Sequence, residues 1–446
     1  MARKPTNPEE IPLHERFPPV EFSGMGAADE KLNQGNLIAA KQVPAFPMAG
    51  GLISHCLTRF GDRIMLDFTQ DSAAVKFEID GFWVPVDPYD RATGDGMLAV
   101  LKKIANLNVQ DRRSRQEGRF GIAYQGNKLI GTITSQGVPT GERVVIRIAP
   151  KKPKFDKIEQ LGMRPKMRDR FKELIDQGQG MVVISTSPGN GLTTLWKIAL
   201  ETADKFVRDF IALEDQASKE EEVINVGPNF FNGPAGESPA TILPKLLLKE
   251  PDAFVVPNFV NAQSLEMLCE QVNKAQKLVV TRSTGRDAAE ALAQLFQYNT
   301  PVKNIASALT MVLNARLARK LCEKCKQAYQ PDPQLLQKLN LAGRVQNLYR
   351  EYVPPPPEER VDEKGRPIEI EICKNCNGIG YRGRTAIFEL LEVTDPIREA
   401  MIAQPNADSI RRAARAAGHR TLQEEGILLI AQGITSLAEL QRVMKN

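Results

Sequence analysis

The sequence MVVISTSPGNGLTT, residues 181–194, decides the fold. Its apolar beginning predicts a buried strand at 181–186, and the pattern from Thr193 onward predicts a helix. The turn between them contains Gly189 and Gly191. A buried strand, a glycine turn and a helix N-terminus together form a nest of backbone N–H groups that can hold phosphate oxygens.

This loop departs from the full phosphate-loop pattern, which is G-x-x-x-x-G-K-[ST]. Gly191 and Thr193 match its second glycine and its hydroxyl, but Leu192 occupies the lysine position and Thr186 that of the first glycine. Leucine cannot neutralise phosphate charge, and losing one charge-assisted contact weakens binding about ten- to a hundredfold. Two interpretations remain open, a weak nucleotide site or a turn without a ligand. The candidate nucleotide-binding residues are Gly189, Asn190, Gly191, Leu192, Thr193 and Thr194.

The region around the loop alternates short apolar strands with helices. Strands are predicted at 181–186, 210–213, 253–256 and 278–281. Helices are predicted at 193–203, 239–249, 262–275 and 287–297. Alternation at this spacing predicts an α/β fold with a mainly parallel, helix-covered sheet, which binds ligands at the carboxyl ends of its strands.

The remaining chain divides by composition and pattern. The first segment is rich in Pro, Asn, Glu and Gly and is expected to be disordered. Strand patterns around one helix then predict a small α+β domain, and a basic linker follows it. The tail after the cysteine-containing element predicts three helices. The expected segments are 1–45 (disordered), 46–150 (small domain), 151–172 (linker), 173–446 (main domain), 321–384 (cysteine element) and 392–446 (helical tail).

Composition limits the classes of function. The chain has 446 residues, 59 basic and 54 acidic, with a net charge of +5. This small excess, without an aromatic and basic stacking surface, does not favour nucleic-acid binding. No stretch approaches the roughly 20 apolar residues of a membrane span, and the beginning lacks the apolar run of a secretory signal. We therefore expect a cytoplasmic protein.

Four of the six cysteines form two C-x-x-C pairs, separated by 47 residues (373 − 325 − 1). Two such pairs supply four thiolates, which suits tetrahedral Zn²⁺ in a closed, structural site. The alternative is four reduced cysteines without a metal. The candidate zinc ligands are Cys322, Cys325, Cys373 and Cys376.

Several segments, in order and spacing, resemble the ATPases of type II secretion and type IV pilus assembly over about residues 50–446. Residues 111–119 (DRRSRQEGR) and 138–147 (VPTGERVVIR) resemble the family's R-x-P-Q-D-G-R and L-P-T…G-E-x-V-x-x-R segments. Glu214 and Asp215 match its E-D-P box, although Gln216 replaces the proline.

The cysteine element also carries the resemblance. Residues 321–385 resemble the family's L-C-x-x-C…C-x-x-C…G-Y-x-G-R-[TS] element, and a helix is expected at 314–320. The resemblance implies a RecA-like ATP/Mg²⁺ domain preceded by a PAS-like α+β domain. It also implies a hexameric ring, formed with itself or a paralogue, that works with inner-membrane platform proteins and lies in the cytoplasm or against that membrane.

The positions expected to be catalytic depart from the family. Asn258 stands at the Walker B glutamate in residues 257–261 (PNFVN, against G-E-I-R-D), and Asn261 replaces an aspartate. Thr284 replaces the histidine of S-T-L-H-T-N-D-A, and Thr134 aligns with the arginine that reaches a neighbour's nucleotide. An amide can orient water but cannot take its proton. The acidic pair Glu214 and Asp215 remains.

These replacements affect the positioning and charge stabilisation on which phosphoryl transfer depends. The sequence therefore indicates a secretion or pilus ATPase homologue with lost or weak ATP hydrolysis. A slow ATPase with a non-standard loop is the alternative. A zinc-dependent nucleic-acid-binding protein is the interpretation with least support.

Overall fold

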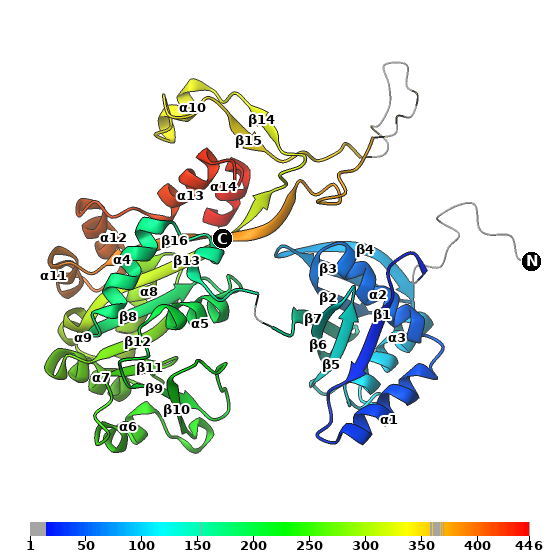
Figure 1. Cartoon of the computed structure of the whole chain (residues 1–446), viewed down its shortest axis with the longest axis horizontal. Helices are drawn as coiled ribbons and strands as arrows, with labels where there is room; N and C mark the ends of the chain where they lie inside the picture. Colours follow the sequence, from blue (N-terminus) through cyan, green and yellow to red (C-terminus); the bar gives the residue numbers. More distant parts are fainter. Residues whose placement is uncertain are drawn as a thin grey trace, which may run out of the picture. The chain divides into compact units, whose positions relative to one another are not determined.

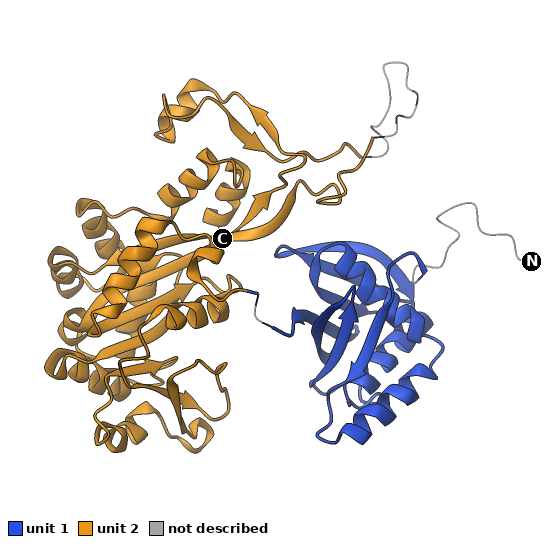
Figure 2. Ribbon diagram, in the orientation of Figure 1, with its two compact units in different colours: residues 1–154 blue, residues 155–446 orange. Residues whose placement is uncertain are grey.

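The computed structural model describes residues 15–152, 154–356, 359, 366, 368 and 370–445. The chain divides into two compact units, with the boundary between Lys154 and Phe155 (Figure 2). Each unit has its own sheet and its own buried core.

The first unit is a seven-stranded antiparallel sheet with the order β1-β5-β6-β7-β2-β3-β4 (Figure 1). Alternate residues such as Ile64, Leu66 and Phe68 are buried, and helices α2 and α3 pack on the sheet. The elements are β1 Val20–Gly24, α1 Glu30–Lys41, α2 Phe46–Thr58, β2 Gly61–Phe68, β3 Ser72–Ile79, β4 Phe82–Asp90, α3 Arg91–Ile104, β5 Gln116–Tyr124, β6 Asn127–Val138 and β7 Gly141–Pro150. The expected PAS-like character of this unit remains a prediction.

The expectation of disorder over residues 1–45 is wrong for β1 and α1; residues 1–14 lie outside the described part of the chain. The strand β1 pairs with β5, and its Phe22 is buried in edge-to-face contact with Phe46 and Phe120. Asn33 in α1 is also buried and bonds both backbone groups of Ala27. One aromatic anchor and one amide order this segment, and neither produces a periodic pattern in the sequence.

The second unit has a seven-stranded sheet with the order β10-β9-β11-β12-β8-β13-β16 (Figure 1). Its strands are parallel except β16, which runs antiparallel to β13. This confirms the α/β class with a mainly parallel sheet. The strands are β8 Gly180–Thr186, β9 Phe210–Asp215, β10 Val226–Phe231, β11 Ala253–Val256, β12 Leu278–Thr284, β13 Leu309–Leu321 and β16 Tyr381–Glu392.

Helices cover both faces of this sheet, and its central strands are therefore buried throughout. Met181 and Val183 pack with one helical layer, α6–α9 with α11 and α12, whereas Val182 and Ile184 pack with α4 and α5. The helices are α4 Pro165–Asp176, α5 Leu192–Thr202, α6 Pro239–Leu247, α7 Ala262–Ala275, α8 Ala288–Leu295, α9 Val302–Ala308, α11 Asp395–Ala403, α12 Ala407–Ala416, α13 Leu422–Ala431 and α14 Leu437–Lys445.

Between the two cysteine pairs, a small two-stranded sheet and a short helix extend from the second unit (Figure 1). These elements are β14 Gln327–Tyr329, α10 Pro333–Lys338 and β15 Leu348–Arg350. The helices α13 and α14 pack with this region and with the far end of β13 and β16 in a separate apolar cluster.

Three sequence predictions differ from this unit. The expected helix at 314–320 is part of β13, because its residues lie in the buried interior of the sheet between β8 and β16. Their helix propensity is overridden by this pairing. The tail forms four helices, not three. Part of the expected linker belongs to the second unit, since α4 begins at Pro165.

Candidate functional site

The glycine loop after β8 has the shape of a phosphate loop. Gly189 and Gly191 have φ angles of 77° and 82°, a left-handed conformation that glycine adopts without strain. Gly191 is the N-cap of α5, and no side chain of the described residues caps this helix. The first N–H groups of α5 are therefore open to an anion.

The loop is bound to two neighbouring strands. The Ser187 hydroxyl donates to the carbonyl of Gly285, which follows β12, at 3.3 Å. The side-chain oxygen of Asn190 accepts from the backbone N–H of Leu317 in β13 at 3.0 Å. The amide of Asn314, also in β13, donates to the Gly285 carbonyl and to Ser185. The turn is thus held without a ligand.

Leu192, at the expected lysine position, is half-buried and packs against the apolar cluster between α5 and the sheet. Leu317 packs against the same cluster. Thr193 and Thr194 are exposed. The loop therefore offers backbone N–H groups and the Thr193 hydroxyl, but a packed aliphatic side chain stands where the pattern has a cation.

The acidic pair lies at the end of β9, and its two members differ. Asp215 accepts hydrogen bonds from the backbone N–H groups of Ala217 and Gly233, at 2.9 and 3.3 Å, which fixes the following turns. Glu214 is half-buried and accepts from the N–H of Glu220 at 3.2 Å. Burial raises the pKa of Glu214 above its ordinary value.

Both asparagines at the Walker B positions have local structural partners. The side-chain oxygen of Asn258 accepts from the Val260 N–H at 3.0 Å and from the Tyr298 hydroxyl at 3.2 Å. Asn261 caps α7 by accepting from the Ser264 N–H at 2.9 Å and its hydroxyl at 2.8 Å. These amides shape the turn between β11 and α7.

The parallel strands bring these positions to one edge of the sheet. Thr284 at the end of β12 stands opposite Thr186, the residue before the loop. Glu214 is the penultimate residue of β9, and Asn258 follows β11. This carboxyl edge is where such sheets bind ligands. Thr134 lies in β6 of the first unit, opposite Glu117 and Val145.

Sequence reasoning missed Arg282, which lies in β12 at the same edge. Its guanidinium bonds both carboxylate oxygens of Glu220, at 2.6 and 3.0 Å, and lies 5.7 Å from the ring centroid of Trp196 in α5. An arginine directly after the buried run LVVT is the signal that would have found it. Arg282 is a cation near Glu214, but its charge is already paired.

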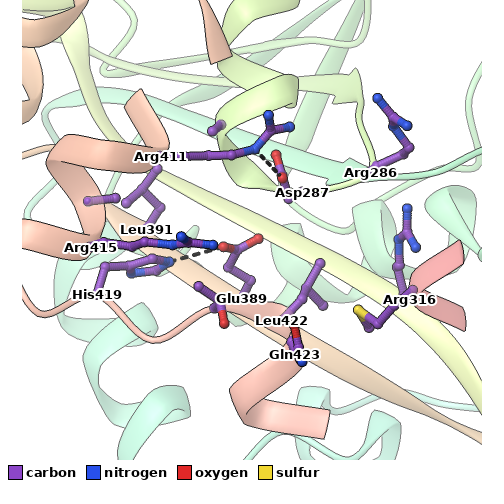
Figure 3. Close-up of a pocket in the computed structure, with 14 residues that line it drawn as sticks. Arg286, Asp287, Arg316, Glu389, Leu391, Arg411, Arg415, His419, Leu422 and Gln423 are labelled. Atoms are coloured by element: carbon purple, nitrogen blue, oxygen red, sulfur yellow. Dashed lines mark hydrogen bonds and ion pairs between the residues drawn. The ribbon is translucent and has the colours of Figure 1, made fainter. Parts of the chain in front are cut away.

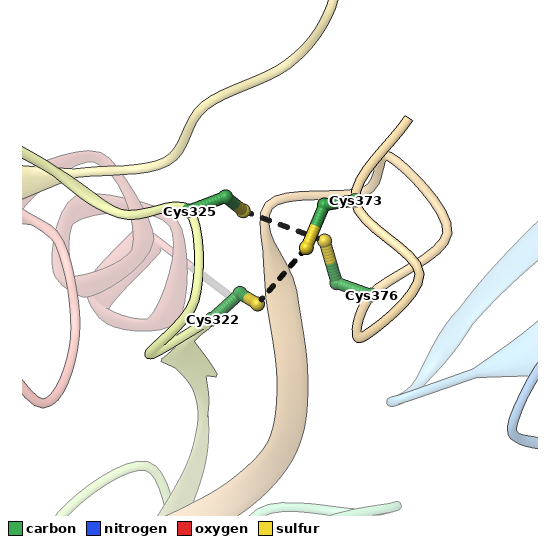
Figure 4. A group of neighbouring side chains, drawn as sticks. All are labelled: Cys322, Cys325, Cys373 and Cys376. Atoms are coloured by element: carbon green, nitrogen blue, oxygen red, sulfur yellow. Dashed lines mark hydrogen bonds between the residues drawn. The ribbon is translucent and has the colours of Figure 1, made fainter. Parts of the chain in front are cut away.

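The four cysteines meet where β13 ends and β16 begins (Figure 4). All four sulfur atoms lie within 4.8 Å of one another, with Cys322 and Cys373 3.8 Å apart and Cys325 and Cys376 3.6 Å apart. A tetrahedral ion with bonds of about 2.3 Å to sulfur would place its ligands about 3.8 Å apart. The cluster therefore has the dimensions to hold one metal ion.

Two donors support the sulfur atoms. The side-chain amide of Asn375 donates to Cys322 Sγ at 3.0 Å, and the backbone N–H of Gly380 donates to Cys376 Sγ at 3.3 Å. Such bonds to thiolates lower the negative charge of a four-sulfur site and orient its ligands.

The fold of the chain is similar to that of solved ATPases. The ATPase DotB of Legionella pneumophila aligns with a TM-score of 0.56 and 12% identity, over 89% of this chain and 94% of that one. The pilus retraction motor PilT with bound ADP aligns with a TM-score of 0.51 and 14% identity, over 88% and 95%. The chain thus has the fold of these ATPases.

The sequence comparison then gives the family. The sequence model of the family described as Type II/IV secretion system protein matches residues 39–442. The chain belongs to this family. It is 31% identical over 394 residues to the type IV pilus assembly ATPase PilB of Thermus thermophilus, covering 87% of this chain but 42% of that protein. It is 24% identical over 417 residues to the type II secretion system ATPase E of Vibrio cholerae, covering 93% and 78%.

Among the described residues, no helix has both the length and the apolar character needed to cross a membrane. The chain covers less than half of the Thermus relative.

Proposed function

We propose that this chain is a component of a type II secretion or type IV pilus machine whose ATP hydrolysis is lost or weak. Family membership supports the machine. The proposed loss of hydrolysis rests on the position of Leu192. This side chain is half-buried against the core at the position where the resemblance requires a phosphate-binding lysine. A packed aliphatic side chain leaves the β- and γ-phosphate charge without its main counter-charge.

The other replaced positions support the same interpretation. The oxygen of Asn258 is engaged by Val260 and Tyr298, and that of Asn261 caps α7. An amide held in this way takes no proton from water. These side chains stabilise turns at the edge where the resemblance implies catalysis. The site that remains is an amide nest with the exposed Thr193 hydroxyl, which suits weak binding of ATP with Mg²⁺.

The role of the chain is then structural or regulatory. Following the resemblance, it assembles with itself or with an active paralogue in a hexameric ring, in the cytoplasm beside inner-membrane platform proteins. Nucleic acid is not its proposed partner, given the near balance of 59 basic and 54 acidic residues. In this proposal the fold is retained for assembly.

The four-cysteine cluster is proposed to hold Zn²⁺. The sulfur separations fit a tetrahedral ion, and Asn375 and Gly380 supply hydrogen bonds to the thiolates. Four protein ligands close the coordination sphere, so the metal joins β13 to β16 and has no position for a substrate.

One observation favours a slow ATPase as the second candidate. Glu214 lies at the carboxyl edge with a pKa raised by burial, and raised pKa values suit a carboxylate for general-base work. In this version Glu214 replaces the missing Walker B glutamate, and the amide nest and the Thr193 hydroxyl hold the phosphates.

ATP turnover by the purified chain distinguishes the two candidates. We expect phosphate release from ATP at the level of buffer alone, unchanged in Thr193→Ala and Glu214→Gln. Thr202→Ala, at the other end of α5, is the matched control. Hydrolysis that both Thr193→Ala and Glu214→Gln abolish, while Thr202→Ala retains it, would establish the slow ATPase and overturn the primary proposal.

A further inference from the structure

A second polar site lies beside the N-terminus of α8, where β13, β16 and α12 meet (Figure 3). It is a pocket of about 380 Å³, within the range of small-molecule sites. Arg286 and Arg316 stand on one side, Arg411 and Arg415 on the other, with Asp287 and Glu389 between them (Figure 3). Four guanidinium groups therefore face two carboxylates.

Both carboxylates are already satisfied by the protein. Asp287 accepts from the Glu290 N–H at 2.8 Å and from Arg411 Nε at 2.7 Å, one bond on each oxygen. Glu389 accepts from the Ala288 N–H at 2.8 Å, and its second oxygen is 3.1 Å from His419 Nε2. These acids hold the start of α8 and the two side chains from the tail, and neither bonds Arg316.

Arg316 is the unusual member of the group. It is only 3% exposed, and its Nε has no hydrogen-bond partner among the described residues. Among the described residues its side chain makes one hydrogen bond, from a terminal nitrogen to the carbonyl of Val443. A buried guanidinium with an open donor and no carboxylate bonded to it is unfavourable unless an anion completes it.

Arg415 adds a second open cation. It lies on α12 at the rim of the pocket, is exposed, and has no recorded ion pair within the described part of the chain. Arg286 faces the pocket from the turn before α8 and pairs with Glu290, outside the pocket. Guanidinium groups match phosphate oxygens in a planar, two-pronged geometry.

We propose that this pocket binds a small phosphate-bearing ligand, with Arg316 as its buried anchor and Arg286 and Arg415 contacting the phosphate from the rim. The proposal does not depend on nucleotide binding at the glycine loop. It assigns this family member a second anion site, formed by the sheet and the helical tail.

The pocket and the glycine loop share one turn. The Gly285 carbonyl accepts from Ser187 in the loop and from Asn314 in β13, and the next residue is Arg286. Asn314 and Arg316 lie two residues apart, on the same face of β13. A phosphate held by Arg286 and Arg316 would fix both sides of this turn. Ligand binding in the pocket can therefore influence the conformation of the glycine loop through Gly285.

The test measures binding of inorganic phosphate and pyrophosphate to the full chain by calorimetry, with sodium chloride at matched ionic strength. We expect saturable binding that Arg316→Met abolishes and Arg415→Ala weakens at least tenfold. Arg412→Ala is the matched control, because Arg412 is an exposed arginine of the same helix whose one hydrogen bond among the described residues is to Gln404, and it does not line the pocket. It is expected to bind as the wild type does.

Thr193→Ala separates the pocket from the glycine loop and is expected to leave phosphate binding unchanged. Loss of binding in Thr193→Ala, equal loss in Arg412→Ala, or no saturable binding by the wild type overturns the proposal. Self-association of the chain that pyrophosphate does not affect, but that is lost in Arg415→Ala, would identify a carboxylate of a second copy as the occupant of the pocket. This result would also overturn the proposal. If Arg316→Met does not fold, Arg286→Ala with Arg415→Ala carries the same test.

Discussion

The side-chain oxygen of Asn190 accepts a hydrogen bond from the backbone N–H of Leu317 at 3.0 Å, which joins the glycine loop to strand β13. The loop is therefore preformed and needs no phosphate to hold its shape. What it lacks is charge, since Leu192 beside it packs into the core.

Restoring the charge is expected to restore binding. Leu192→Lys should strengthen binding of a fluorescent ATP analogue about ten- to a hundredfold, because one charge-assisted contact contributes roughly 1.5–3 kcal/mol. Thr194→Lys, which adds the same charge at an exposed position in the first turn of α5, is expected to strengthen binding much less. Equal gains in both variants would show that general charge, and not the loop geometry, is responsible.

Val260, between β11 and α7, is expected to be a site of backbone strain. Its φ is 67°, a left-handed conformation that is unfavourable for a β-branched residue, and its side chain is exposed. Asparagine tolerates this conformation, so Val260→Asn should raise the free energy of unfolding by about 1 kcal/mol. Urea denaturation measures the change. Val207→Asn, another exposed valine, should give no gain; a similar gain there would attribute the effect to surface polarity.

The buried Glu439 in α14 predicts a pH dependence of stability. Its side chain is fully buried and bonds Arg319 at 2.8 and 3.0 Å and Arg442 at 2.6 and 2.9 Å. Although burial alone would raise it, these hydrogen bonds hold the pKa of Glu439 below its ordinary value of 4.5. The stabilisation is thus fully present above pH 4.5 and is lost as the pH falls through the folded-state pKa.

At neutral pH, Glu439→Gln should lower the free energy of unfolding by about 3 kcal/mol, because it removes the buried carboxylate that bonds both Arg319 and Arg442. The difference from wild type should shrink as the pH falls below 4.5, in chemical denaturation at several pH values. Glu399→Gln, at an exposed position of α11, should change little at any pH. A Glu439→Gln difference that is constant with pH would contradict the assigned ionisation.

Metal analysis tests the cysteine cluster. The wild type should carry about one zinc ion per chain, since one closed site uses four ligands. Cys373→Ser should lose the ion and melt at a lower temperature, and a strong chelator should have the same effect on the wild type. Lys374→Ala, the exposed neighbour between two ligands, should keep the metal. A stably folded wild type without metal would contradict the zinc assignment.

The sequence predicts this fold best where the pattern is local. The strand β8, the glycine turn and α5 were predictable because an apolar run, two glycines and a helical period follow one another directly. The strand β13 was not, because its Ala, Leu, Arg and Lys residues favour a helix, and only burial between β8 and β16 makes them extended.

The candidate site divides in the same way. The cysteine cluster was predictable because C-x-x-C spacing is itself a ligand geometry, and the sulfur atoms do meet. The arginine pocket was not, because Arg286, Arg316 and Arg411 come from three separate elements. Nothing near Arg316 in the sequence indicates that its guanidinium is buried without a carboxylate.

The position of the cysteine pairs determines how strongly the stability of the chain depends on the number of residues between them. With a metal bound, a cross-link spans the 47 residues between Cys325 and Cys373, and closing a loop of this length removes on the order of 4 kcal/mol of chain entropy from the unfolded state. This contribution varies only with the logarithm of loop length. Insertions between the end of β15 and Cys373 should therefore alter the contribution of this cross-link very little, whereas deletions that reach Leu341 or Leu348 would also remove side chains buried against α13 and α14.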